Sequence, residues 1–91
     1  MFAIIRRYKY DPANHETIDS LIRGEFRDML STMQGFHEYY WLETGDGEGA
    51  SVGIWDNKES ADLSTDMARS WVHANLGQYL TTPPEILEGD I

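Results

Sequence analysis

The sequence predicts an α+β domain with the element order β-α-β-β-α-β. Two long segments, 14–34 and 58–80, carry apolar residues at helical spacing. Between them, two strand-like segments flank the glycine-rich stretch 45–49, which is typical of a hairpin turn. A further strand-like segment lies at each end of the chain. This order predicts the ferredoxin-like arrangement, in which two helices cover one face of a four-stranded antiparallel sheet.

The first predicted strand covers residues 2–10 and ends at the turn signal Asp11-Pro12. Its alternation places one set of side chains on a common face, namely Phe2, Ile4, Arg6, Tyr8 and Tyr10. A helix over 14–34 follows, with Phe26 at the edge of its apolar stripe and Gly35 as a suitable end. The stripe comprises Ile18, Leu21, Ile22, Met29, Leu30 and Met33.

The two middle strands are predicted over 36–43 and 50–55. Strict alternation in the first of them places His37, Tyr39 and Trp41 on one face. A single sheet with helices on one side leaves its other face open, and we expect these three side chains to lie there. An exposed aromatic face favours association with a second copy of the chain.

The second helix is predicted from Lys58 to Leu80, with a break near Gly77. It follows Asp56-Asn57, which closes the preceding strand. Pro83-Pro84 then leads into a last strand over 85–91, because proline cannot donate a hydrogen bond within a sheet.

Small residues on the inward face of the second helix leave two interpretations open. Ala61, Ser64, Thr65 and Ala68 cannot fill the space toward the sheet, so either the helix packs closely or a cavity lies there. A cavity would hold Arg6 as a fixed positive charge on a mainly aromatic wall, which suits a planar, oxygenated or carboxylated organic ligand. The candidate site residues are Arg6, Tyr8, Tyr40, Trp55, Ser64, Met67, Trp71 and His73.

Composition and charge narrow the function classes. The 91 residues form one domain, 1–91. The 16 acidic and 7 basic residues give a net charge of −9, so nucleic acid and membrane surfaces are not expected partners. The absence of cysteine excludes disulfides and thiolate catalysis. No segment has the pattern of a membrane span or signal peptide, and a cytoplasmic location is expected.

Two motif-like features carry no chemistry in this interpretation. Residues 49–53 match the G-x-S-x-G nucleophile elbow, which requires a strand-to-helix turn at the serine, whereas Ser51 lies within a predicted strand. His15, His37 and His73 stand at no standard zinc spacing, so no metal site is predicted. His73 is either a proton carrier beside a pocket or a solvated residue on the helix flank.

With these residues placed, nearly the whole chain resembles the dimeric α+β barrel superfamily, most closely its antibiotic-biosynthesis-monooxygenase-like branch. The segments that carry the resemblance are 2–8, 35–40, the Asp46-Gly47 hairpin, 54–61 and 71–76. The resemblance implies a homodimer in which two sheets face each other as a barrel through their open faces. It also implies a small-molecule pocket in each subunit, between the sheet and the helices.

The resemblance implies several functions. Some relatives are cofactor-independent oxygenases of aromatic polyketides or quinols. Others degrade haem with an asparagine, a tryptophan and a histidine; here Arg6 replaces the asparagine, Ser64 or Thr65 replaces the tryptophan, and His73 lies close to the histidine position. The first hypothesis is therefore a monooxygenase that needs no cofactor and acts on a small aromatic or quinol-type compound. The alternatives are a non-catalytic small-molecule-binding or stress-related protein on the same scaffold, and an amino-acid-sensing regulatory domain.

The most specific expectation concerns Arg6. Its guanidinium is predicted to point into a pocket shared with Tyr40 and Trp71. The alternative is a strand-edge residue that pairs with one of the many acids. A charge-assisted hydrogen bond from Arg6 to a ligand would stabilise binding by about 1.5–3 kcal/mol.

Overall fold

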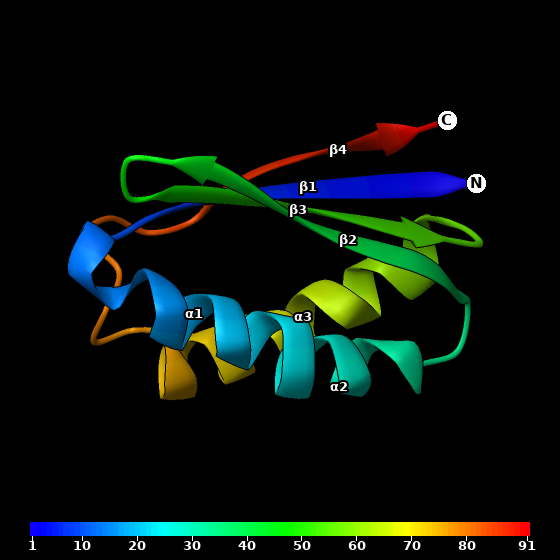
Figure 1. Cartoon of the computed structure of the whole chain (residues 1–91). Coiled ribbons are helices and arrows are strands. Elements are labelled where there is room, and N and C mark those ends of the chain that lie inside the picture. The colour runs from blue at the N-terminus through cyan, green and yellow to red at the C-terminus, as the bar shows by residue number, and fades with distance from the viewer.

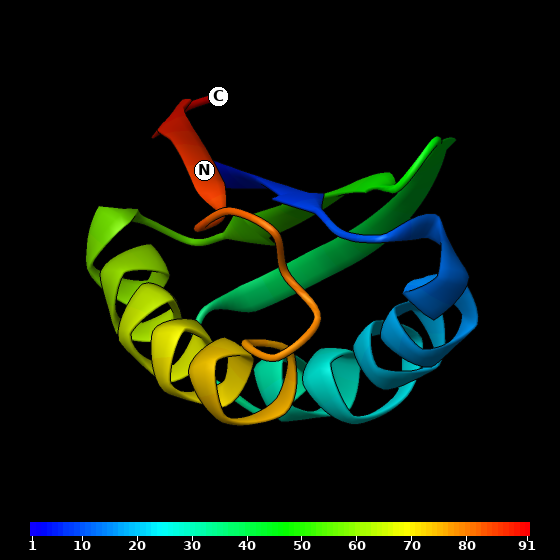
Figure 2. The ribbon, with the colours of Figure 1, turned by 90° about the vertical axis from the view of Figure 1, so that its left-hand side faces the viewer.

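The computed structural model describes all residues, 1–91, and confirms the predicted order of strands and helices. Figure 1 shows two layers, with the sheet on one side and the helices on the other. The strands are β1 (Phe2–Lys9), β2 (Phe36–Gly45), β3 (Glu48–Trp55) and β4 (Glu85–Asp90), all antiparallel in the order β2-β3-β1-β4. The helices α1 (His15–Leu21), α2 (Arg27–Ser31) and α3 (Lys58–Asn75) cover one face of this sheet (Figure 2). The architecture is the expected ferredoxin-like one.

The helical segment after β1 contains a π-helical turn, Ile22–Phe26, between α1 and α2. Its fully buried side chains are spaced by four residues and are Ile18, Ile22, Phe26 and Leu30. In a regular α-helix, four-residue steps drift around the axis, because one turn takes 3.6 residues. The wider π turn offsets that drift and keeps the four side chains on one face. Phe26 therefore lies at the centre of the buried stripe, and its predicted place at the edge is wrong.

The predicted alternation of β2 is wrong, because His37 forms a β-bulge. Phe36 pairs with Trp55 and Glu38 pairs with Ile54, so His37 is the extra residue between two consecutive pairs. Each later side chain therefore lies on the opposite face from the predicted one. Tyr39 and Trp41 are buried on the helix-covered side. The glycine at position 49 makes room for the Trp41 ring, because a β-carbon there would overlap it.

The first half of α3 packs closely against the sheet, and α3 ends earlier than predicted. Ala61 and Ser64 are fully buried. The helix stops at Asn75, two residues before Gly77, and residues 76–79 form turns instead of a continuing helix. A β-carbon at Gly77 would lie 2.7 Å from the carbonyl oxygen of His73. No helix in the structure combines the length and the apolar character that a membrane span requires.

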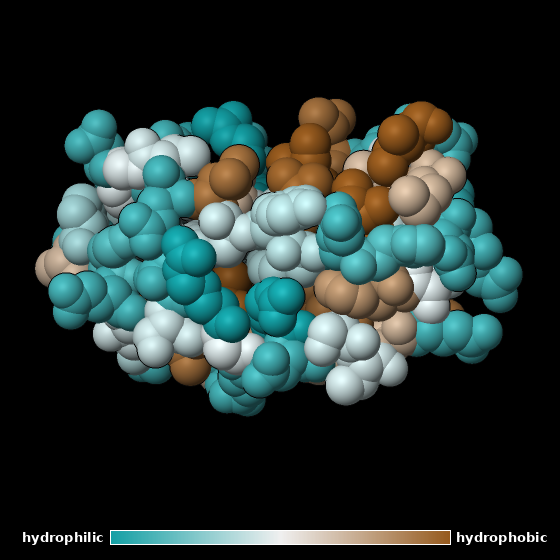
Figure 3. All heavy atoms as spheres, turned by 45° about the vertical axis from the view of Figure 1, so that its right-hand side comes forward, coloured by the Kyte–Doolittle hydropathy of each residue, from teal (hydrophilic) through white to brown (hydrophobic).

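The open face of the sheet is apolar at its centre. Register places Ile5 beside Val52, with Leu87 and Tyr40 on the neighbouring strands of the same face. Leu42 lies there too, and Tyr40, Leu42 and Leu87 are 51%, 49% and 69% exposed. Figure 3 shows hydrophobic side chains gathered along the upper side of the molecule, over the sheet. The open face is thus apolar as expected, but with residues other than His37, Tyr39 and Trp41.

Candidate functional site

A cavity of about 520 Å³ lies between the second half of α3, strands β1 and β4, and the segment 77–84. Figure 2 shows this segment crossing from the end of α3 toward β4. The cavity lies beside the helix surface formed by Thr65, Ala68 and Val72, side chains too short to reach the sheet. Both interpretations of the small-residue stripe therefore apply, with close packing in the first half of α3 and a cavity in the second.

Arg6 extends from β1 into this cavity and is 3% exposed. Its Nη2 donates a hydrogen bond to the Thr65 hydroxyl at 3.2 Å. The Thr65 hydroxyl in turn donates to the carbonyl oxygen of Ala61 at 3.1 Å, so its oxygen is oriented to accept from Arg6. Nη1 of Arg6 has no partner, and no carboxylate forms an ion pair with this guanidinium. The alternative of an acid-paired Arg6 on the strand edge is therefore wrong.

Further buried donors lie on the inner face of the sheet. The hydroxyls of Tyr8, Tyr39 and Ser51 and the Trp55 indole nitrogen are buried without a hydrogen-bond partner. Burial raises the pKa of Tyr8, against the smaller opposing effects of the Arg6 charge and the Ser51 hydroxyl. Burial also raises the pKa of Tyr39. Both phenols therefore stay protonated at neutral pH.

The charge of the cavity contrasts with the charge of the chain. Among the fourteen lining residues are Arg6, Arg69 and His73, and none is an aspartate or a glutamate. The chain as a whole carries 16 acids and a net charge of −9. Arg69 lies on the exposed flank of α3, where its Nη1 is 3.5 Å from the carboxylate of Asp66. The cavity is thus a positively charged site in an acidic protein.

Only three of the eight candidate residues line this cavity, namely Arg6, Tyr8 and His73. Tyr40 lies on the open face, where its hydroxyl donates to Glu38 at 2.6 Å, because the bulge at His37 reverses the alternation. Met67 lies on the exposed side of α3. The expectation that Arg6 shares its pocket with Tyr40 and Trp71 is therefore wrong for both partners.

The remaining candidates belong to the packed interior. The Trp71 ring packs against Phe26 at 4.7 Å, and its indole nitrogen donates to Glu25 at 3.1 Å. Trp55 is fully buried with an edge contact to Phe36 at 5.5 Å. Ser64 donates to the carbonyl oxygen of Ala61 at 2.6 Å. These three side chains fill the core and do not line the cavity.

The sequence reasoning identified only part of one wall of the cavity: it included Thr65 and His73 and missed Arg69 and Gly77. Thr65, Arg69, His73 and Gly77 follow one another at four-residue steps and line the same side. A four-residue spacing is typical of residues on one face of a helix, so the sequence could have indicated that they lie on the same side. The opposite wall has no such signal, because the segment 80–84 reaches the cavity only through the tertiary fold.

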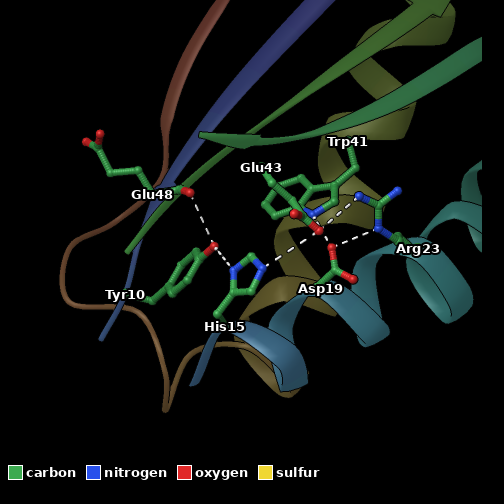
Figure 4. A network of polar contacts seen from close by, with 7 residues as sticks. All are labelled: Tyr10, His15, Asp19, Arg23, Trp41, Glu43 and Glu48. Carbon is green, nitrogen blue, oxygen red and sulfur yellow. Dashed lines mark hydrogen bonds and ion pairs between the residues drawn. The ribbon is translucent and has the colours of Figure 1, made fainter. Parts of the chain in front are cut away.

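A separate polar network joins α1 to the hairpin end of β2 and β3 (Figure 4). Asp19 accepts hydrogen bonds from Arg23 at 2.8 Å and from the indole of Trp41 at 2.9 Å. Arg23 also contacts Glu43 at 3.2 Å. His15, Asp19 and Glu43 place ligand-type atoms within 4.8 Å of one another, but Arg23 already occupies both carboxylates. These residues therefore form a network of ion pairs within the chain and not a metal site.

This network predicts a specific pH dependence of stability. Partial burial opposes the shift, but hydrogen bonds from Arg23 and Trp41 and the Arg23 charge outweigh it and lower the pKa of Asp19. The stabilisation is therefore present above the unfolded pKa of about 3.9 and is lost as the pH falls through the folded pKa. We expect Asp19→Asn to lower Tm by about 2–6 °C at pH 7, measured by thermal unfolding. The difference should close as the pH falls through the folded pKa of Asp19, and a difference that stays constant into strong acid would contradict the assignment.

Together, the fold and the cavity define a small α+β domain with a ligand-sized, positively charged site between sheet and helices. No protein-family model matches the chain, and no curated protein matches it. Solved structures do match. A protein of unknown function from Nitrosomonas europaea, NE2512, has a TM-score of 0.87 at 13% identity, covering 99% of this chain and 87% of that one.

Two further matches have named activities. One is a monooxygenase from the gene ActVA-Orf6 of Streptomyces coelicolor in complex with nanaomycin D, with a TM-score of 0.78, 18% identity, and 99% and 89% of the two chains covered. The other is SnoaB of Streptomyces nogalater, a cofactor-independent oxygenase, with a TM-score of 0.71, 15% identity, and 99% and 91% covered. Another match is named an antibiotic biosynthesis monooxygenase. The chain has the fold of these proteins, and the resemblance is confirmed at that level.

Proposed function

We propose that this protein is a monooxygenase that needs no cofactor and acts on a small aromatic or quinol-type compound bound in the cavity. The observation that carries the proposal is the buried Arg6 guanidinium, which lines a cavity of about 520 Å³ and is paired with no carboxylate. A cavity of this size lies within the range of about 300–1,000 Å³ that small-molecule sites occupy. Solved structures of the same fold include a cofactor-independent oxygenase and a monooxygenase in complex with nanaomycin D, which supports the reaction class.

In this proposal the substrate itself supplies the electrons that reduce dioxygen. An electron-rich aromatic compound becomes a stronger reductant when its hydroxyl group ionises. Arg6 would stabilise the resulting anion, and the surrounding walls would exclude water and position the ring. Among the lining side chains, His73 carries an imidazole, the group that most often transfers protons in enzymes. It lies on the exposed flank of α3, where a proton it accepts can pass to solvent.

The test is oxygen consumption with a panel of hydroquinones, measured with an oxygen electrode. We expect turnover that exceeds the spontaneous oxidation of at least one hydroquinone and that His73→Gln lowers. The second candidate function, a non-catalytic small-molecule-binding protein, rests on the same cavity without a demonstrated reaction. Tight binding of a hydroquinone without oxygen consumption would support that second function and count against the first.

We also propose that two copies associate through the open sheet face. Ile5 and Val52 lie side by side at the centre of this face, and Tyr40, Leu42 and Leu87 extend the apolar surface to the outer strands. Contiguous apolar surfaces of this kind mark protein interfaces on small domains. A two-fold axis would bury the same residues from both copies.

A further inference from the structure

We infer that Thr65 is a positioning residue of this site, because its side-chain hydroxyl holds the Arg6 guanidinium in one place at the wall of the cavity. The inference rests on the proposed function, in that it takes Arg6 as a residue that contacts the substrate, and it adds a residue that acts through Arg6. It follows from the hydrogen bonds of the Thr65 hydroxyl, from the lack of an acidic partner for Arg6, and from a comparison with the neighbouring hydroxyl on α3.

The Thr65 hydroxyl has a fixed direction. It donates its proton to the carbonyl oxygen of Ala61, one turn earlier in α3, at 3.1 Å. A hydroxyl has a single proton, so the Thr65 oxygen acts as the acceptor toward Arg6, whose Nη2 lies 3.2 Å away. The bond to Ala61 also selects one of the two side-chain rotamers that threonine adopts in a helix. Thr65 is therefore oriented by its own helix and serves as a fixed acceptor for a residue of β1.

Arg6 depends on this one contact. Its side chain is 3% exposed, and the guanidinium makes its hydrogen bond to Thr65 and no ion pair with a carboxylate. No aspartate or glutamate lines the cavity, so no acidic side chain there could take over if the Thr65 hydroxyl were removed. Holding a long arginine side chain in one geometry costs conformational entropy. The bond to Thr65 is the interaction that offsets this cost.

A comparison with the adjacent Ser64 separates a local role from a role at the site. The Ser64 hydroxyl also donates to the carbonyl oxygen of Ala61, at 2.6 Å, but Ser64 is fully buried and does not line the cavity. Bonds of this kind to the preceding turn slightly destabilise a helix. A β-branched residue is also less favourable in a helix interior than alanine. Of the two hydroxyls, that of Thr65 contacts Arg6 and lines the cavity, which gives this unfavourable residue a reason.

A double-mutant cycle on stability tests whether the Thr65 hydroxyl acts on Arg6. Thr65→Val keeps the shape of the side chain, and we expect it to lower the urea midpoint by about 1 M or more, because a hydrogen bond from a charged donor is lost. In the Arg6→Met background the same substitution should shift the midpoint by less than about 0.5 M. Thr82→Val removes another hydroxyl from the same cavity and is the matched control, with an expected shift below about 0.5 M. Thr65→Ala, a better helix former, replaces Thr65→Val if that variant does not fold.

The guanidinium of Arg6 gives a second, spectroscopic readout that needs no substrate. We expect its Nη protons to appear as separate NMR signals in the parent, because a fixed guanidinium rotates slowly about its carbon–nitrogen bonds. Thr65→Val should broaden or merge these signals, and Thr65→Ser should keep them separate, because serine retains the acceptor oxygen. Thr82→Val should leave them unchanged. A Thr65 that only packs within the helix would not affect the Arg6 signals, so unchanged signals in folded Thr65→Val would overturn the inference.

Oxygen consumption with the hydroquinones gives the readout at the site and distinguishes the two possible failures. We expect Thr65→Val to lower kcat/KM about three- to tenfold, and to have no further effect in the Arg6→Met background. Changes in stability and NMR signals that depend on Arg6, without turnover of any hydroquinone, would retain the positioning role and remove the monooxygenase. Turnover that Thr65→Val leaves unchanged, or a loss that is equal with and without Arg6, would retain the monooxygenase and overturn the inference.

Discussion

Replacing Val52 with lysine is expected to convert a dimer of twice 10.4 kDa into a monomer of 10.4 kDa in sedimentation equilibrium at micromolar concentration. Val52 lies on β3 beside Ile5 of β1, at the centre of the open face. If a second copy covers this face, the new ammonium group is buried in an apolar interface without a counter-charge. That burial costs several kcal/mol, so the dimer dissociation constant should rise by about a thousandfold or more.

The same lysine should be harmless within one subunit. The open face has no covering helix, so the ammonium group of a monomer reaches solvent (Figure 1). Ser70→Lys adds the same charge at an exposed position on α3 and is the matched control, expected to remain dimeric. A monomeric parent at micromolar concentration would contradict the proposed interface. So would a Val52→Lys variant that dimerises as tightly as the parent.

The fold was predictable because the turn residues and the spacing of apolar residues indicate the same order of strands and helices. Asp11-Pro12 separates a segment with strand spacing from one with helical spacing, and the glycines of the 45–49 hairpin separate two segments with strand spacing. The face of β2 was not predictable, because one inserted residue at His37 reverses the faces of positions 38–43. Tyr39 and Trp41 sit where a strict two-residue alternation would not place them, and no local turn signal marks the bulge.

The candidate site was predictable only where a residue's face followed from regular alternation. Arg6 and Tyr8 lie on the unbroken strand β1, so their alternation with Ile4 places them correctly on the helix-covered side. The prediction that Trp71 lines the pocket was wrong for a different reason. It lies on the predicted inward stripe of α3, but that stripe is wide enough to face both the cavity and Phe26, and the bulky ring contacts Phe26. Helical periodicity predicts burial, and it does not distinguish between two buried neighbours.

Phe26 is expected to be the position where truncation destabilises the monomer most clearly. The side chain is fully buried, with ring centroids 4.7 Å from Trp71 and 5.8 Å from Tyr39. It thereby joins the π turn to α3 and to β2. Phe26→Ala removes these contacts and leaves a cavity that aromatic neighbours cannot easily fill, which typically costs about 3–5 kcal/mol. A domain of this size has a total stability of about 5–14 kcal/mol, so the loss is a large fraction of it.

Urea denaturation followed by tryptophan fluorescence measures this effect. With a denaturant dependence of about 1–1.5 kcal/mol per molar urea for a small domain, the midpoint should fall by about 2 M or more with an unchanged slope. Leu63→Ala removes a large apolar side chain from an exposed position on α3 and should shift the midpoint by less than about 0.5 M. Both variants are measured at one protein concentration, because self-association adds to apparent stability. If Phe26→Ala shifted the midpoint no more than Leu63→Ala, the contacts of Phe26 with α3 and β2 would not stabilise the domain. Burial of Phe26 would then not explain why the chain forms the π turn.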